Sequence, residues 1–184
     1  MPYSFKRGKN EIREILISTL PPETKVLDIG AGSGTYFNLL GDYFPTMDAV
    51  EVFAPNIEKF SLQEKYRKVF NQDCLEFSFE EEYGLIIMGD VLEHLRVEDA
   101  QDFIKRALDS NPKAQMMIAV PYEHPQHGVG GNTHERHLQE DLNKENFSER
   151  YPDFELAILL KSPSKRKEFA GGYYLRKGSF EKPV

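Results

Sequence analysis

The segment KVLDIGAGSG, from Lys25 to Gly34, constrains the fold more than any other part of the chain. A short apolar run, Val26 to Ile29, leads into three glycines separated by single residues, and the stretch from Thr35 to Leu40 suits a helix. This pattern predicts a strand, a tight glycine turn and a helix N-terminus. Glycine permits positive φ angles and a close approach of backbone to ligand, and a helix end adds unpaired N–H groups. We therefore expect a nucleotide-like ligand at this turn.

The glycine spacing narrows the ligand class. A dinucleotide fingerprint needs G-x-G-x-x-G, but Thr35 stands where its third glycine would fall, which disfavours a nicotinamide-dependent oxidoreductase. The pattern D-x-G-x-G-x-G resembles motif I of the class I S-adenosylmethionine (SAM) dependent methyltransferases, whose loop packs against the methionine part of the cofactor. The alternative is a turn without a ligand. The resemblance implies a SAM site that includes Asp28, Gly30, Ala31, Gly32 and Gly34.

Composition indicates one globular domain over residues 1–184, in which we expect 1–8 and 178–184 to be flexible. A formal net charge of -7 repels phosphate backbones, so we expect no nucleic-acid partner. The single cysteine, Cys74, permits no intramolecular disulfide. Neither a signal peptide nor a membrane span is recognisable, and we therefore expect a cytoplasmic protein without a membrane partner. The sequence makes no prediction of the oligomeric state.

Apolar runs and helical stripes alternate along the chain, which predicts an α/β fold with a parallel sheet and right-handed crossovers. The resemblance to the methyltransferases implies a more specific fold, a Rossmann-like, mostly parallel sheet of seven strands with an antiparallel seventh strand and helices on both faces. The expected strands are 26–29, 48–53, 69–70, 84–88, 114–120, 154–160 and 168–175. The expected helices are 9–20, 35–40, 55–64, 96–109 and 138–147.

Two acids lie at the carboxyl ends of the second and third expected strands. Glu51 stands about twenty residues past the first glycine, where βαβ folds place the acid that binds ribose hydroxyls. Val52 and Phe53 belong to the same expected site, with Phe53 against the adenine. The resemblance implies that Asp73 meets the adenine amino group and that Cys74 offers its backbone N–H, not a nucleophilic thiol. The alternatives are a plain strand-end carboxylate for Glu51 and a turn aspartate for Asp73.

The apolar run 84–88 ends in GDVLEH, from Gly89 to His94. This D-x-L-E-H pattern resembles motif IV of family members that methylate small molecules, and it lacks the (D/N)-P-P-(Y/F) motif of enzymes that methylate base amines. Asp90 is expected at the carboxyl end of the strand, in contact with the cofactor or the acceptor. For Glu93 and His94 we consider a structural role that pins the loop, which we favour for His94.

Four of the five histidines lie between Pro121 and His137, a segment expected over the acceptor site. One interpretation is a lid with a general base, for which we favour His124 or His127. A second is a metal site built from two H-x-x-H pairs, which lack the H-E-x-x-H spacing, and we expect no metal. A third is structural, in which His134 and His137 begin the next helix and hydrogen-bond the loop.

The resemblance implies direct transfer of a methyl group from SAM to an oxygen or nitrogen of a small-molecule acceptor. The basic stretch 161–167 is expected beside the active-site mouth, where it would attract an anionic acceptor. The acidic stretch 76–82 is interpreted as a solvated face. The alternative function is a non-catalytic protein that binds SAM or its product, S-adenosylhomocysteine.

Overall fold

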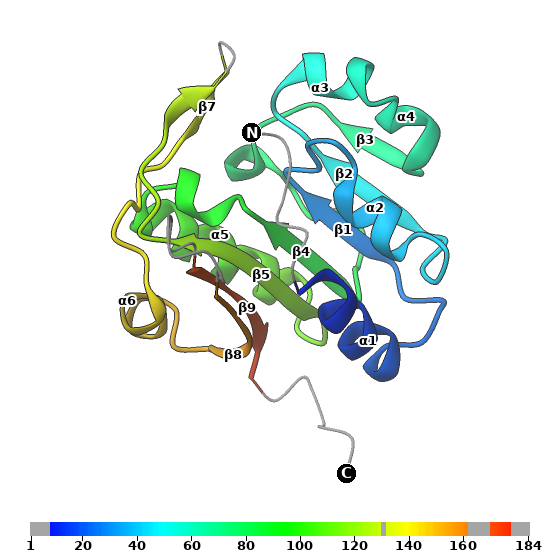
Figure 1. The fold of residues 1–184 in the computed structure, drawn as a ribbon. Coiled ribbons are helices and arrows are strands. Elements are labelled where there is room, and N and C mark those ends of the chain that lie inside the picture. Colours follow the sequence, from blue (N-terminus) through cyan, green and yellow to red (C-terminus); the bar gives the residue numbers. More distant parts are fainter. Residues whose placement is uncertain (1–7, 130–131, 162–169, 178–184) are drawn as a thin grey trace.

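The computed structural model describes residues 8–129, 132–161 and 170–177. A seven-stranded sheet lies at its centre in the order β3-β2-β1-β4-β5-β9-β8 (Figure 1). The strands β3, β2, β1, β4 and β5 run parallel, whereas β9 is antiparallel to both of its neighbours. The predicted Rossmann-like topology, with an antiparallel last strand, is confirmed. The strands are β1 (Val26–Ile29), β2 (Met47–Val50), β3 (Lys68–Phe70), β4 (Leu85–Gly89), β5 (Gln115–Tyr122), β8 (Phe154–Lys161) and β9 (Ala170–Arg176).

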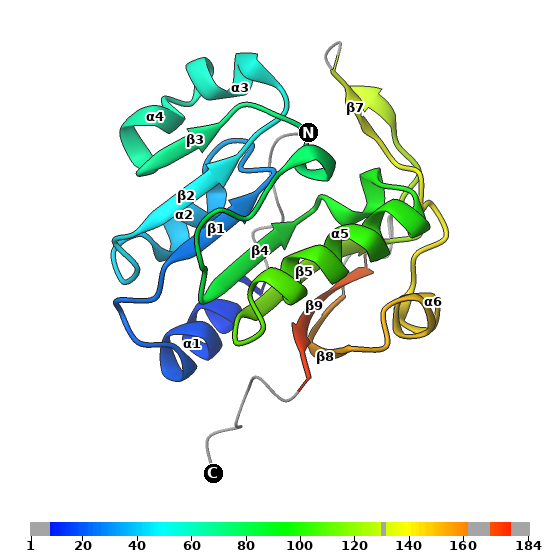
Figure 2. The ribbon, with the colours of Figure 1, turned by 180° about the vertical axis from the view of Figure 1, so that it is seen from behind.

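Helices cover both faces of the sheet, as Figures 1 and 2 show from opposite sides. Residues of α1, α2, α3 and α4 pack in one apolar core, and residues of α5 and α6 pack in the other. Strand β4 serves both cores because alternate residues point to opposite faces: Leu85 and Ile87 enter the first, and Ile86 and Met88 the second. The helices are α1 (Lys9–Thr19), α2 (Thr35–Leu40), α3 (Ala54–Lys59), α4 (Leu62–Lys65), α5 (Val97–Ser110) and α6 (Lys144–Arg150). None of the helices in the described ranges is long and apolar enough to cross a membrane.

Several element boundaries differ from the sequence prediction. The helix expected over 55–64 is two short helices, because Ser61 adopts a left-handed φ of 48° between them. The helix expected over 138–147 begins only at Lys144, where the Asn143 side chain caps it. Strand β5 continues through Pro121 to Tyr122, paired with β9. The expected basic segment lies outside the described residues except for Lys161, as do residues 1–7 and 178–184.

The histidine-rich segment forms a hairpin instead of an irregular loop. Strands β6 (His127–Val129) and β7 (Asn132–Arg136) pair antiparallel and project away from the main sheet (Figure 1). His134 therefore lies in a strand, and His137 follows that strand directly. Neither residue begins a helix, so the expected helix start was wrong, whereas the expected hydrogen bond to the segment is present for His137, whose Nδ1 bonds the His124 carbonyl.

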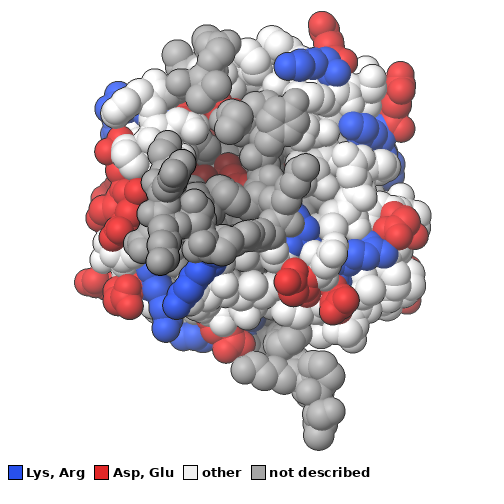
Figure 3. Space-filling model, in the orientation of Figure 1, with Lys and Arg blue, Asp and Glu red and all other residues white. Residues whose placement is uncertain are grey.

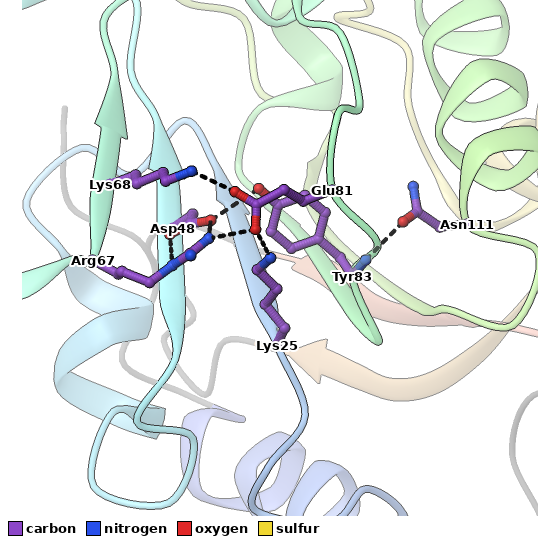
Figure 4. Close-up of polar contacts among 7 residues, drawn as sticks. All are labelled: Lys25, Asp48, Arg67, Lys68, Glu81, Tyr83 and Asn111. Atoms are coloured by element: carbon purple, nitrogen blue, oxygen red, sulfur yellow. Dashed lines mark hydrogen bonds and ion pairs between the residues drawn. The ribbon is translucent and has the colours of Figure 1, made fainter.

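An ion-pair network joins the amino ends of the strands (Figure 4). The buried carboxylate of Asp48 accepts hydrogen bonds from Arg67 and from the Tyr83 hydroxyl. Glu81 forms ion pairs with Lys25, Arg67 and Lys68. Glu81 belongs to the acidic stretch interpreted as a solvated face, and its side chain is 30% exposed although it lies in this network. The pKa of Glu81 is lowered to about 2, chiefly by its hydrogen bond to Lys25. These contacts fix the edge of the sheet opposite to the glycine turn.

Gly89, the last residue of β4, is in close contact with an aromatic ring. A Cβ atom at this position would lie 2.0 Å from Cε2 of Tyr36. Tyr36 is itself buried in α2, and the Lys9 ammonium lies 3.8 Å from the centre of its ring. The absence of a side chain at residue 89 therefore lets α2 pack against the end of β4.

We predict that Gly89→Ala lowers the free energy of unfolding by about 1–3 kcal/mol, because the core overpacks at Tyr36. Urea unfolding measures the loss, and Tyr36→Leu provides the space that the new methyl group needs. The double variant should lose less than the sum of the two single losses. Strictly additive losses would show that the Tyr36 ring is not the obstacle.

Candidate active site

A cavity of about 440 Å³ opens where β1, β2, β3 and β4 end. This is the carboxyl edge of the sheet, where open α/β folds bind their ligands. Its lining comes from the glycine turn after β1, from the residues that follow β2, β3 and β4, and from the β6–β7 hairpin. Among the predicted site residues, the lining includes Gly30, Ala31, Gly32, Glu51, Val52, Asp73, Cys74, Asp90 and His124.

The glycine turn has the backbone that the sequence pattern requires. Gly30, Gly32 and Gly34 have φ angles of 67°, 54° and 76°, all in the region that disfavours side chains. Gly30 also approaches the residues after β4, since a Cβ atom there would lie 2.4 Å from Cγ2 of Val91. Two independent constraints therefore demand glycine at residue 30.

Glu51 ties the end of β2 to the glycine turn. One of its carboxylate oxygens accepts a hydrogen bond from the Gly32 N–H at 2.7 Å, and the other accepts one from the Phe53 N–H at 2.8 Å. The residue is only 4% exposed. Burial raises the pKa of this carboxyl, although the two N–H donors oppose the shift. A carboxylate has about four acceptor positions. The N–H groups of Gly32 and Phe53 and the Asn56 side chain use three of them, which leaves room for a further donor.

Asp28 lies behind the glycine turn and not among the described residues that line the cavity. Its Oδ2 accepts a hydrogen bond from the Tyr66 hydroxyl, whereas its buried Oδ1 has no hydrogen-bond partner within the described ranges. Burial raises the pKa of Asp28 to about 7. Burial also lowers the pKa of nearby Lys9 to about 8, against the attraction of Asp90 and Asp28. The Asp28 side chain therefore joins β1 to Tyr66 at the end of α4.

Asp73 and Cys74 meet the cavity at the end of β3. The Asp73 carboxylate accepts a hydrogen bond from the Leu75 N–H at 2.9 Å and so caps the 3₁₀ turn Cys74–Glu76. Burial raises the pKa of the Cys74 thiol to about 12, which keeps the thiol protonated at neutral pH. This agrees with the expectation that Cys74 is not a nucleophile.

The residues after β4 hold the hairpin in place. The backbone oxygen of Glu93 accepts hydrogen bonds from the N–H groups of Leu138 and Gln139, and Nδ1 of His94 donates to the Arg136 carbonyl at 3.1 Å. Nδ1 of His137 is hydrogen bonded to the His124 carbonyl. The structural role considered for Glu93 and favoured for His94 agrees with these contacts. The sequence did not indicate that the hairpin brings His137 back to them.

Burial also perturbs the titration of these groups. It lowers the pKa of His94, and it lowers that of His137 to about 4. Burial raises the pKa of Glu93 well above its usual value, and the neighbouring charge of Asp90 adds to that shift. Both imidazoles are therefore neutral at pH 7.

The remaining predicted residues lie at the periphery. His124 is exposed at the cavity rim, whereas His127 is exposed in β6 and outside the described lining. Gly34 and Phe53 also fall outside that lining; Gly34 caps α2, and Phe53 holds the Glu51 carboxylate through its N–H. The roles expected for these four residues stay predictions.

Acidic groups dominate the charged part of the cavity lining. Arg96 and Arg136 are its basic side chains within the described ranges. Figure 3 shows acidic atoms in the hollow on this face of the molecule. The site therefore suits a cationic ligand better than a pyrophosphate. The acidic lining residues are Glu51, Asp73, Asp90, Glu93, Asp99 and Glu135.

Comparison with known proteins decides the family. The model of the methyltransferase domain family matches residues 4–156, most of the chain. The chain belongs to the class I SAM-dependent methyltransferases. These are enzymes that use SAM and release S-adenosylhomocysteine. The search of curated proteins finds no match.

Solved structures of methyltransferases share the fold. A SAM-dependent methyltransferase from Clostridium acetobutylicum is 12% identical, with a TM-score of 0.65 over 96% of this chain and 93% of that one. The 1,6-didemethyltoxoflavin-N1-methyltransferase of Burkholderia thailandensis is 16% identical, with a TM-score of 0.64 over 93% and 79%. The magnesium protoporphyrin IX methyltransferase of Synechocystis PCC 6803 is 13% identical, with a TM-score of 0.62 over 93% and 79%.

We predict that Asp28 makes the methyltransferase less stable as the pH rises from 4 to 7. The native chain keeps the Asp28 proton up to a pKa of about 7, whereas the unfolded chain releases it near 3.8. The contribution of Asp28 to the free energy of unfolding should therefore fall across this window by up to about 4 kcal/mol. Asp28→Asn should remove this contribution, so the unfolding free energy of the variant relative to the unmodified chain should rise with pH by that amount, as urea unfolding at several pH values will measure.

Asp153→Asn is the matched control, because Asp153 is an exposed aspartate. This control should keep the pH dependence of the unmodified chain. An Asp28→Asn variant with the same slope as the unmodified chain would contradict the assignment of the raised pKa to Asp28.

Proposed function

We propose that this methyltransferase transfers a methyl group from SAM to an oxygen or nitrogen atom of a small molecule bound in the same cavity. The observation that carries the proposal is the Glu51 carboxylate, anchored to the glycine turn and presented at the cavity wall. Two of the three solved structures described above are named for small-molecule substrates, 1,6-didemethyltoxoflavin and magnesium protoporphyrin IX.

The lining residues fit the parts of SAM. We propose that Glu51 accepts hydrogen bonds from the ribose hydroxyls and that Asp73 and the Cys74 backbone meet the adenine, with Val52 and Phe53 beside it. The glycine turn would lie along the methionine part of the cofactor. The acidic lining suits the positive sulfonium and ammonium groups of SAM, whereas it would repel the pyrophosphate of a dinucleotide.

The contribution of the protein to the reaction is mainly alignment. When bound, SAM supplies a methyl group that its sulfonium charge already activates. The cavity walls and the β6–β7 hairpin hold the acceptor in line and exclude water. Proton removal is secondary, and we propose His124 at the cavity rim as the general base, with His127 as the second candidate.

The chemical class of the acceptor depends on two parts of the chain. The anionic acceptor expected from the sequence rests on the basic segment 161–167, of which Lys161 alone is described. The acidic cavity lining does not itself attract an anion. An anionic acceptor therefore stays a prediction, whereas the proposal of a small-molecule acceptor rests on the size and position of the cavity.

We predict that Glu51→Gln weakens SAM binding by about 10- to 100-fold, because a charge-assisted hydrogen bond contributes about 1.5–3 kcal/mol. Isothermal titration calorimetry with SAM and with S-adenosylhomocysteine measures the loss. The NH₂ group of the new glutamine cannot accept a hydrogen bond from the N–H groups of Gly32 and Phe53, so the variant could lose stability. A thermal melt of each variant therefore separates lost SAM binding from lost structure.

Glu149→Gln, a change at an exposed residue of α6, should bind SAM as the unmodified chain does. The proposed cofactor site would be wrong if a folded Glu51→Gln variant bound SAM as tightly as the control. It would also be wrong if the unmodified chain bound NADH and not SAM.

A further inference from the structure

Three side chains with metal-ligating atoms converge in the cavity. Glu93 and His94 lie in the 3₁₀ turn Leu92–His94 after β4, and His137 returns to them at the end of the hairpin. One ligand atom from each residue lies within 4.8 Å of the other two. All three residues line the cavity beside the glycine turn.

The hydrogen bonds around the two imidazoles orient them for ligation. Nδ1 of His94 bonds the Arg136 carbonyl, and Nδ1 of His137 bonds the His124 carbonyl. A carbonyl oxygen only accepts, so both Nδ1 atoms carry the proton and each Nε2 keeps its lone pair. Metal-binding histidines use this same arrangement, in which the second ring nitrogen donates to a carbonyl or carboxylate.

Glu93 provides an independent indication of a cation. Its side chain is only 2% exposed, and its buried Oε2 has no hydrogen-bond partner among the residues that the structure describes. A buried carboxyl oxygen without a partner is costly, and Asp90 and Glu135 add negative charge around it. A divalent cation at this point would satisfy the oxygen and balance the charge.

We propose that Glu93, His94 and His137 bind one divalent transition-metal ion of the Zn²⁺ type. Two imidazoles and a carboxylate favour such an ion over Mg²⁺ or Ca²⁺. The separation of 4.0 Å between His94 Nε2 and Glu93 Oε1 exceeds the roughly 3.3 Å of a tetrahedral site, a gap that small side-chain rotations close. Three protein ligands leave a coordination position open toward the cavity.

The ligand set differs from the one that the sequence suggested. Of the two H-x-x-H pairs, only His137 takes part, and its partners come from the segment that follows β4. If the proposed function holds, the open position lies in the same cavity as the acceptor, where the ion would bind an acceptor oxygen. Metal binding itself does not depend on SAM.

The test uses the full chain without a histidine tag, treated with a chelator and then titrated with Co²⁺ and Zn²⁺. The proposal predicts one equivalent of Co²⁺ with visible absorption bands of the bound ion, displaced by Zn²⁺. It also predicts a higher melting temperature with Zn²⁺, because the ion binds the folded state.

The variants remove one ligand atom each and disturb the hydrogen bonds little. His94→Asn and His137→Asn keep a donor near the position of Nδ1 but lack Nε2, and Glu93→Gln keeps the shape of the side chain. Each should bind the metal at least about 100-fold more weakly, since even loss of a supporting partner costs 10- to 100-fold. His127→Asn, at the exposed histidine in β6, should keep the metal affinity.

Calorimetric titration of the same proteins with SAM separates this proposal from the proposed function. An unmodified chain that binds SAM but shows no Co²⁺ bands and no Zn²⁺-dependent stabilisation overturns the metal site alone. Metal affinity that all three ligand variants retain also overturns it. Metal binding without SAM binding would support the metal site and contradict the proposed function.

Discussion

The hydrogen bond from the Gly32 N–H to the Glu51 carboxylate joins the two structural features on which the site depends. This hydrogen bond links the glycine turn, whose conformation requires positive φ angles, to the end of the neighbouring strand β2. Close packing supports the turn on both sides, since Gly30 touches Val91 and Gly89 touches Tyr36. Ion pairs hold the amino edge of the sheet. The opposite, carboxyl edge presents carboxylates and backbone groups to a ligand.

Elements with strong local signals were predictable from the sequence. The alternation of apolar runs with helical stripes identified the sheet, and the spacing of Gly30, Gly32 and Gly34 separated a SAM loop from a dinucleotide loop. The position of Glu51 relative to that turn follows from chain length in a βαβ unit. In each case the chemistry depends on residues close together in sequence or at a fixed distance along a regular element.

Features that depend on tertiary contacts were not predictable. The two H-x-x-H pairs of the segment 121–137 do not follow the two-residue alternation of a strand, so nothing local indicated a hairpin or the return of His137 to Glu93 and His94. The ion pairs of Glu81 were not visible in the sequence, because its cationic partners come from two distant parts of the chain, Lys25 and the adjacent pair Arg67 and Lys68. Asp28 fits the methyltransferase motif, but its side chain turns away from the cavity toward Tyr66, which no motif encodes.

The central claim is that SAM lies between the glycine turn and the carboxylates of Glu51 and Asp73. A crystal structure of the full chain with S-adenosylhomocysteine tests it most directly. The account predicts ribose hydroxyls within hydrogen-bond distance of Glu51 and the adenine next to Asp73 and Cys74. Density for the ligand outside this cavity, or ribose hydroxyls that avoid Glu51, would contradict it.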